Sequence, residues 1–385
     1  MIPTALTDEH RQIREAARQF AEREVLPHVR DWDRAEEMDR AIVGKLAQAG
    51  YLGATIAERY DGSELDTVGY AQVIEELGRA DNSVRGVVSV SAGLVAKTLG
   101  RWGSEPQRET WLPRLAAGET LGCFALTEPD SGSDPGSLRT TATPTAGGGW
   151  RIDGSKVFIT NGTWAGLALV FARTGEPGPR GLSCFAVPTD RPGWTARPIK
   201  GKFGLRAQDT AEVALEALEV GEDELVGALG DGFKIAMSAL DGGRISLAAS
   251  CTGTAQACLD ASVAYAAERQ QFGRSIARFQ LVQELIANIA VDVAAARLLT
   301  WQAAAKADLG QRCTLEASTA KYFASEAAVR AANAAVQVFG GYGYVDEYPV
   351  GKYLRDARVT TLYEGTSQIQ TLIIGRHLTG ESAFA

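Results

Sequence analysis

The chain has 385 residues, 45% of them apolar, which is enough for two or three domains with substantial cores. Its net charge of -8 at pH 7 and its scattered basic residues argue against a nucleic-acid partner. Because the apolar runs are shorter than the roughly 20 residues of a membrane-spanning helix, and the acidic N-terminus has no signal-peptide pattern, we expect a cytoplasmic protein without a membrane partner.

The first third of the chain has the spacing of amphipathic helices. From Asp8 to about Gly118, apolar residues recur at helical intervals, as in Ile13, Ala16 and Phe20. We therefore expect an all-α domain over residues 1–120.

The middle of the chain changes to short runs of β-forming residues. Stretches such as 156–160, 167–172 and 183–187 are separated by Gly, Pro and Asp, and residues 143–149 fit the tip of a hairpin. This pattern predicts a small antiparallel β domain, a barrel or sandwich, over residues 121–228.

The helical period returns after residue 230 in alanine-rich segments. Residues 233–267, 281–309 and 314–339 predict long helices of a four-helix bundle, which we place at residues 229–385. The predicted fold class is therefore α+β, with a β domain between two helical domains.

The polar residues exclude several kinds of site. The histidines His10, His28 and His377 do not have metal-ligand spacing, so we predict no metal site. The sequence also lacks the glycine fingerprints of a phosphate loop, a nucleophile elbow and a Rossmann fold. No two cysteines form a C-x-x-C pair, so we predict buried thiols. The cysteines are Cys123, Cys184, Cys251, Cys258 and Cys313.

A single carboxylate near the C-terminus is the best candidate for a reacting group. The segment Tyr363-Glu364-Gly365-Thr366-Ser367-Gln368 places it on a turn or strand end just before an apolar helix. Thr366 or Ser367 can cap that helix, and Ser367 with Gln370 fits a reciprocal capping box. Glu364 can act as a base, or it can simply favour the positive end of the helix dipole.

Four motifs, in the same order as the helical, β and helical blocks, are similar to those of one enzyme family. They are residues 123–134, residues 269–273 followed by Phe279 and Gln280, residues 337–343, and residues 363–368. Over essentially its whole length the chain resembles the acyl-CoA dehydrogenases. The resemblance implies FAD-dependent α,β-dehydrogenation of a short or medium acyl thioester, a homotetramer or homodimer, and an electron-transferring flavoprotein as electron acceptor.

The resemblance also implies a set of flavin-binding residues. A flavin ring is apolar on its faces and polar along one edge, so it needs donors, hydroxyls and an apolar wall. The residues of the middle domain would line the ring, and a neighbouring subunit would help to grip the rest of the cofactor. Singly, each residue is also common in cores, turns or solvated helices. The set is Phe124, Leu126, Thr127, Gly132, Ser133, Phe158, Thr160, Arg269, Phe272, Gln280, Gln337, Gly341, Thr366 and Gln368.

By the same resemblance, Glu364 takes the α-proton of the thioester while a hydride leaves the β-carbon. The helix N-terminus lowers the pKa of a carboxylate, so burial must raise it for Glu364 to be an effective base. Tyr363 would line the acyl chain, unless it is an ordinary core residue. Ser133, Asp241 and Arg244 would contact the substrate, although Arg244 can also pair with a carboxylate inside the bundle.

The identity of the acyl group has several alternatives. The region around Arg85 resembles glutaryl-CoA dehydrogenases, in which the matching arginine holds a distal carboxylate. Their acidic residue two helical turns earlier is Gly78 here, however, and Arg85 can instead be a solvated charge. An acyl or aminoacyl group tethered to a carrier protein is a further alternative. So are an oxidase that passes electrons to oxygen, and an inactive protein that binds flavin or thioester without reaction.

Overall fold

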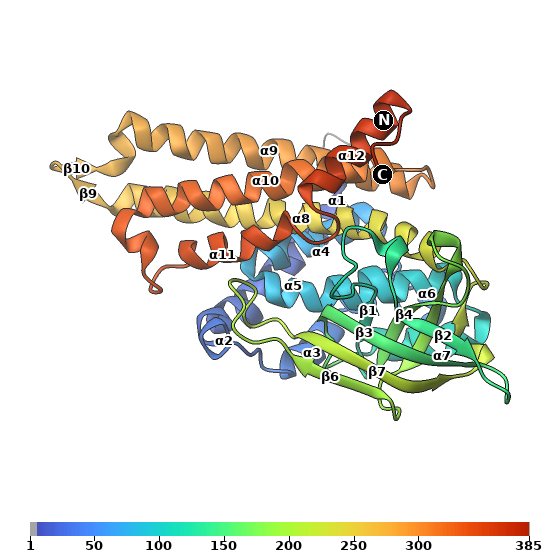
Figure 1. The fold of residues 1–385 in the computed structure, drawn as a ribbon. Coiled ribbons are helices and arrows are strands. Elements are labelled where there is room, and N and C mark those ends of the chain that lie inside the picture. Colours follow the sequence, from blue (N-terminus) through green and yellow to red (C-terminus); the bar gives the residue numbers. More distant parts are fainter. Residues whose placement is uncertain (1–5, 385) are drawn as a thin grey trace.

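The computed structural model describes residues 6–384, which form two helical parts and a sheet (Figure 1). The blue and cyan N-terminal helices come first, the green strands follow, and the long yellow-to-red helices end the chain. The N-terminal helices contact both of the other parts, since α4 packs on α8 and the segment after α5 packs on β1. This is the predicted α+β architecture.

Helix α4 is the centre of the N-terminal part. Asp66 caps it by accepting a hydrogen bond from Gly69 N at 2.6 Å, and its Ile74 and Leu77 are fully buried. Asp81 then caps α5 at Val84 N, and a wide π-helical segment joins α5 to α6. The helices are α1 Asp8–Phe20, α2 Val29–Ala35, α3 Ala41–Gln48, α4 Thr67–Ala80, α5 Asn82–Val88, the π-helical segment Ser89–Ala96, α6 Lys97–Trp102 and α7 Glu105–Ala116.

The sheet lies where the β domain was predicted, in the order β6-β7-β3-β2-β4-β5-β8, and most neighbours are antiparallel. The predicted hairpin tip joins β2 to β3, where Pro144 pairs with Trp150. Two pairings, β1 with β4 and β2 with β4, are parallel, which the sequence did not indicate because side chains alternate in the same way in both directions. The strands are β1 Gly122–Ala125, β2 Thr141–Pro144, β3 Trp150–Thr160, β4 Leu167–Arg173, β5 Leu182–Pro188, β6 Trp194–Pro198, β7 Thr210–Val220 and β8 Leu225–Val226.

Long helices form the C-terminal part, within a residue or so of the predicted bounds. Alanines such as Ala248, Ala324 and Ala328 are fully buried, and their small side chains let the helices approach closely. Helix α8 packs on both α4 and α10, so it runs through the middle of the molecule. The elements are α8 Gly232–Glu268, the short strands β9 Gln270–Gln271 and β10 Arg274–Ser275, α9 Gln280–Asp308, α10 Thr314–Phe339, α11 Val350–Thr360 and α12 Ser367–Thr379.

A buried ion cluster ties the three parts together. Lys352 Nζ on α11 lies 2.6 Å from Asp81 Oδ2 and 2.5 Å from Asp356 Oδ2. Asp356 also accepts a hydrogen bond from Leu205 N, in the segment between β6 and β7, at 2.7 Å. The cluster thereby fixes α5, which follows Asp81, relative to α11, which leads to Glu364.

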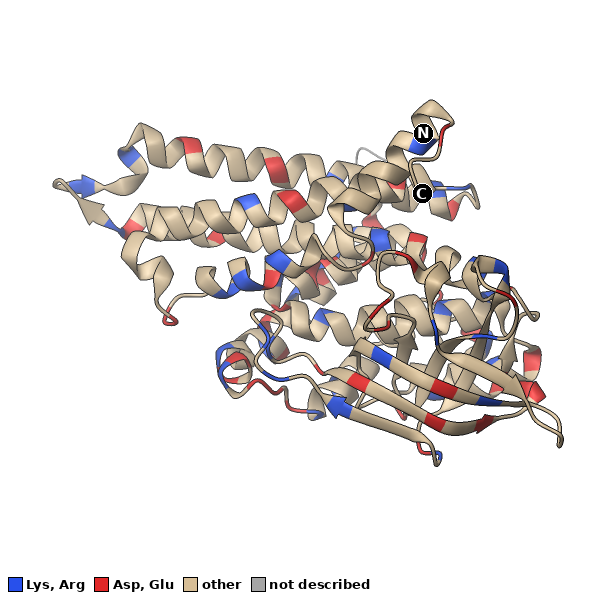
Figure 2. Cartoon of the chain, in the orientation of Figure 1, with Lys and Arg blue, Asp and Glu red and all other residues tan. Residues whose placement is uncertain are grey.

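Acidic and basic residues are interspersed over all three parts (Figure 2). Four cysteines are buried as predicted, whereas Cys313 is partly exposed. Across residues 6–384, no cluster of His, Cys, Asp and Glu side chains is placed to hold a metal ion, and no helix has the length and apolarity needed to cross a membrane.

Candidate active site

Glu364 lies on a tight turn between α11 and α12. Both Glu364 and Gly365 have left-handed backbone, with φ of 57° and 86°. Thr366 caps α12 by accepting a hydrogen bond from Ile369 N at 3.2 Å. The alternative of a strand end is wrong, because α11 continues to Thr360.

The predicted capping box of Ser367 and Gln370 is also wrong. Gln370 Nε2 instead donates to Glu364 O and Gly365 O, each at 3.0 Å. Ser367 Oγ lies 2.5 Å from Glu326 Oε1. Gln370 therefore fixes the turn that carries the carboxylate rather than the first turn of the helix.

The Glu364 carboxylate is buried against the backbone of α8. A Cβ atom added to Gly243 would lie 2.6 Å from Oε2 and 2.7 Å from Oε1, so only glycine leaves room for it. Burial raises the pKa of Glu364 to about 7, although the charges of Arg244, Lys321 and Arg85 act to lower it. Burial affects the pKa more than the nearby positive charges do, so the carboxylate is suited to proton abstraction near neutral pH.

Arg85 is buried beside this turn, so the alternative of a solvated surface charge is wrong. Its two terminal nitrogens donate to Tyr363 Oη at 2.7 Å and to Ser89 Oγ at 3.1 Å. Both partners are neutral hydroxyls, and among residues 6–384 Arg85 Nε has no partner. A buried guanidinium without a bonded carboxylate is costly, and it is available to an anionic ligand.

Arg244 on α8 takes one of the two roles that were open for it, since it pairs with a carboxylate inside the bundle. Its Nη1 lies 2.8 Å from Asp241 Oδ1, a pair within the bundle, and its Nε lies 3.4 Å from Glu364 O. Asp241 also accepts a hydrogen bond from Thr314. Arg244 is thus held by Asp241 next to the turn.

The flavin residues predicted in the middle domain lie on β1, in the segment that follows it, and on β3. The β3 bulge turns Phe158 outward, with φ of 60° and 67% of the residue exposed. Val157 N donates to Thr127 O at 2.9 Å, and Thr160 Oγ1 accepts a hydrogen bond from Gln208. Gly132 faces open space.

Two residues of that set also serve the core. Phe124 packs on Phe171, with ring centroids 4.8 Å apart, and Leu126 is buried. The exposed ring of Phe158, the hydroxyls of Thr127 and Ser133 and the nearby backbone nevertheless suit a flat ring with one polar edge. These residues fit a flavin.

The other predicted flavin residues fall into two further groups. Thr366 and Gln368 lie beside the base, at the start of α12. Arg269 and Phe272 lie in the β9–β10 region, at the opposite end of the bundle from α12 (Figure 1). Arg269 stacks on Tyr342, beside Gly341, at 5.3 Å, and Phe272 is 91% exposed. Gln280 and Gln337 are exposed as well. One chain therefore does not bring this distant group to the base.

Sequence reasoning missed the roles of four residues that shape the site. Lys156 Nζ donates to Leu126 O in the flavin segment, and Lys321 Nζ donates to Gly365 O. Gly243 and Gln370 position Glu364, as described above. Two signals were present in the sequence: adjacent glycines inside a long helix, and a lysine within an alanine stripe, both of which oppose the local pattern.

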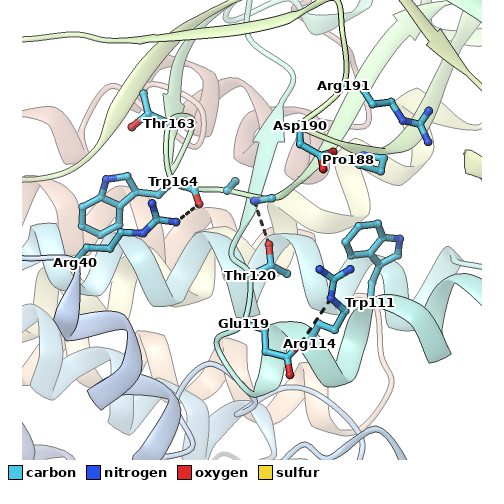
Figure 3. Close-up of a pocket in the computed structure, with 12 residues that line it drawn as sticks. Arg40, Trp111, Arg114, Glu119, Thr120, Thr163, Trp164, Pro188, Asp190 and Arg191 are labelled. Atoms are coloured by element: carbon cyan, nitrogen blue, oxygen red, sulfur yellow. Dashed lines mark hydrogen bonds and ion pairs between the residues drawn. The ribbon is translucent and has the colours of Figure 1, made fainter.

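A cavity of about 700 Å³ lies between the N-terminal helices and the sheet, away from the turn of Glu364 (Figure 3). Its arginines are engaged by their neighbours: Arg191 lies 2.6 Å from Glu224, Arg114 lies 3.7 Å from Glu119, and Arg40 donates to Trp164 O. None of the predicted site residues lines it.

The comparisons with known proteins agree with the fold. The chain matches the acyl-CoA dehydrogenase N-terminal domain at residues 7–119, the middle domain at residues 123–218 and the C-terminal domain at residues 230–379. An acyl-CoA dehydrogenase of Bacillus subtilis (strain 168) is 43% identical, over 97% of this chain and 99% of that protein.

Two solved structures are similar over nearly the whole chain. Butyryl-CoA dehydrogenase from Megasphaera elsdenii superposes with a TM-score of 0.95 and is 37% identical, covering 98% of this chain and 99% of its own. Glutaryl-CoA dehydrogenase from Mycobacterium smegmatis, in complex with FADH2, superposes with a TM-score of 0.94 and is 32% identical, covering 99% and 97%. The chain therefore belongs to the acyl-CoA dehydrogenase family and is an FAD-dependent oxidoreductase of acyl-CoA thioesters.

Proposed function

We propose that Glu364 is the base that removes the α-proton of a short saturated acyl-CoA. The observation that carries this proposal is the buried carboxylate, whose pKa is raised to about 7 and whose Oε2 has no hydrogen-bond partner among residues 6–384. A carboxylate that titrates near neutral pH combines a usable ionised fraction with high basicity. When bound, FAD supplies the acceptor for the hydride that leaves the β-carbon.

The remaining groups of the turn fix the geometry of that step. Gln370 and Arg244 hold the carbonyl of Glu364, and Gly243 leaves the space in which the carboxylate lies. Tyr363, held by Arg85, would form one wall of the acyl site. Such positioning is worth orders of magnitude in rate, because proton abstraction needs the reacting atoms aligned and close.

We further propose that FAD is shared between subunits of a homotetramer or homodimer. Phe124, Leu126, Thr127, Gly132, Ser133, Phe158, Thr160, Thr366 and Gln368 would hold the cofactor in one subunit. Arg269, Phe272, Gln280, Gln337 and Gly341 would hold it from a neighbouring copy. The exposure of Phe272, and of Leu281 and Val291 on α9, supports an association at that end of the bundle.

Other parts of the proposal rest on the family resemblance. They are a cytoplasmic location, an electron-transferring flavoprotein as acceptor, a division into domains at residues 1–120, 121–228 and 229–385, and contacts of Ser133, Asp241 and Arg244 with the substrate. The element order supports the division, since helices give way to strands at β1 and return at α8.

A second candidate substrate is an acyl-CoA with a distal carboxylate. The buried guanidinium of Arg85, bonded only to hydroxyls and with Nε unpartnered within residues 6–384, favours it. A carboxylate would satisfy this group with charge-assisted hydrogen bonds. The Arg85→Gln variant should then lose reactivity with glutaryl-CoA and retain it with butyryl-CoA.

The test is anaerobic bleaching of the bound flavin by butyryl-, hexanoyl- and glutaryl-CoA and by carrier-linked thioesters. Replacing Glu364 with Gln should leave FAD bound and slow bleaching by roughly a thousandfold or more. Bleaching of this variant at the wild-type rate would exclude Glu364 as the base. A colourless wild-type protein would instead favour the inactive binding protein, and peroxide formed without an added acceptor would favour an oxidase.

A further inference from the structure

Lys321 is a fully buried lysine that points at the catalytic turn. It lies on α10 among Ala317, Ala320 and Ala324, all fully buried. Its Nζ donates to Gly365 O at 2.7 Å, and this is its only hydrogen bond among the described residues. An ammonium taken out of water for one carbonyl is costly, so a structural hydrogen bond alone does not account for a lysine here.

The bonded carbonyl belongs to the residue after the base. Gly365 O accepts from Lys321 on α10 and from Gln370 on α12, while Glu364 O accepts from Gln370 and from Arg244 on α8. Three helices thus clamp two consecutive left-handed residues. A neutral donor in place of Lys321 would preserve this clamp, so the hydrogen bond and the charge can be separated by experiment.

The charge of Lys321 acts on the carboxylate of Glu364. Burial lowers the pKa of Lys321 to about 8, while Cys251, Glu364 and Glu326 raise it and Arg244 lowers it. In the other direction, Lys321 lowers the pKa of Glu364 together with Arg244 and Arg85. The other titratable groups facing the turn are Tyr363 and the thiol of Cys251.

We infer that Lys321 is a positioning residue whose positive charge increases the ionised fraction of Glu364 at neutral pH while its hydrogen bond holds the turn. The inference rests on the proposed role of Glu364 as the base. Arg244 and Arg85 also face the carboxylate, but each has further partners in Asp241, Tyr363 and Ser89. Lys321, in contrast, makes its hydrogen bond within the described residues only to the turn.

Two variants separate charge from hydrogen bonding. Lys321→Gln retains a donor for Gly365 O and removes the charge, whereas Lys321→Met removes both. The first measurement is the rate of flavin bleaching by butyryl-CoA as a function of pH. The second is exchange of the α-hydrogen for solvent deuterium, followed by mass spectrometry, which needs the base but no net oxidation.

The acidic limb of both pH profiles should lie near pH 7 in the wild type and should move upward by roughly one pH unit in both variants. At pH 6 the variants should therefore react about tenfold more slowly. Above pH 8.5 the Gln variant should approach the wild-type rate, while the Met variant stays slower because its turn has lost a donor. A matched control is Lys45→Met, an exposed lysine on α3, which should leave the limb in place.

Unshifted limbs in the variants that fold would overturn the inference, and so would a Gln variant identical to the wild type at every pH. Melting temperature and FAD absorbance establish folding, and if one variant fails to fold, the limb of the other decides. Glu364→Gln is measured in parallel. Bleaching by that variant refutes the proposed base itself, whereas loss of bleaching together with unshifted Lys321 limbs refutes only the role of Lys321.

Discussion

Two fully buried lysines lie at the proposed flavin segment and at the turn of Glu364, and they are bonded very differently. Lys156, on β3 below the flavin segment, lies 2.8 Å from Glu128 Oε1 and donates to Leu126 O and Phe171 O at 3.2 and 2.7 Å. Glu128 in turn accepts the backbone N–H groups of residues 139 and 140. Lys156 and Glu128 thus both have several partners, and their charges are paired.

The region around Lys321 is built in the opposite way. Lys321 has one carbonyl as its hydrogen-bond partner. Three atoms at or beside the turn of Glu364 are also buried with no partner within residues 6–384: Arg85 Nε, Glu364 Oε2 and Gln370 Oε1. Buried polar groups are normally satisfied, so unsatisfied ones gathered at a single turn indicate a site completed by its ligand. The contrast distinguishes the scaffold of the sheet from the reaction centre.

The largest effect should come from breaking the saturated network. Lys156→Met leaves the charge of Glu128 buried without its cation, which should lower the free energy of unfolding by about 3–5 kcal/mol. Urea unfolding followed by circular dichroism measures this loss, and FAD should dissociate more easily because Leu126 lies in the flavin segment.

The double variant Lys156→Met with Glu128→Gln is the control for this prediction. It removes both charges and keeps acceptors for the two backbone N–H groups, so much of the stability should return. A single variant as stable as the wild type would contradict the view that this network is a scaffold.

A smaller effect, confined to the reaction centre, should follow from filling the space beside the base. In Gly243→Ala the new methyl group meets the carboxylate of Glu364 at 2.6 Å, so the carboxylate must move. Flavin bleaching should slow by roughly a hundredfold, while the helix itself gains propensity.

The neighbouring residue provides a matched control. A Cβ atom at Gly242 meets nothing within 4 Å, so Gly242→Ala makes the same chemical change in the same helix without touching the base. Equal bleaching rates in the two alanine variants would contradict the described position of Glu364.

Long periodic elements of this fold were predictable from the sequence. The bounds of α10 were predicted correctly and those of α8 and α9 to within a residue, because a buried stripe repeated over many turns gives a strong signal. Glu364 could be singled out as a candidate because a carboxylate on an apolar-flanked turn is unusual. The parallel pairings of β1 and β2 with β4 and the π-helical segment before α6 were not predictable, since neither changes the hydrophobic pattern.

The residues that surround Glu364 could not be predicted from the sequence, for a physical reason. Gly243 and Lys321 are 121 and 43 positions away from Glu364 along the chain, so only packing of the helices reveals that they meet the turn. The local rule, a capping box of Ser367 and Gln370, failed because Gln370 bonds the two carbonyls of the turn instead. Tertiary hydrogen bonds thus replaced the local capping motif at the turn that carries the proposed base.

The smallest effect concerns stability at the reaction centre and depends on pH. The pKa of Glu364 rises from 4.5 to about 7 on folding, so the folded state is favoured less as the carboxylate ionises. The cost is absent below pH 4.5, grows between pH 4.5 and 7, and is constant above pH 7. Glu364→Gln removes it, so the stability advantage of this variant over the wild type should be small at pH 5 and should grow by roughly 2.5 kcal/mol between pH 5 and pH 8.

Urea unfolding of both proteins at pH 5, 6, 7 and 8, without substrate, measures the difference, in which the titration of all other groups largely cancels. A Gln variant that is equally or less stable at pH 8, or a difference independent of pH, would mean that the carboxylate is not held in a desolvated state. A difference that grows between pH 5 and 7 would show that this turn, unlike the saturated network of Lys156, gives up stability to keep a reactive group buried.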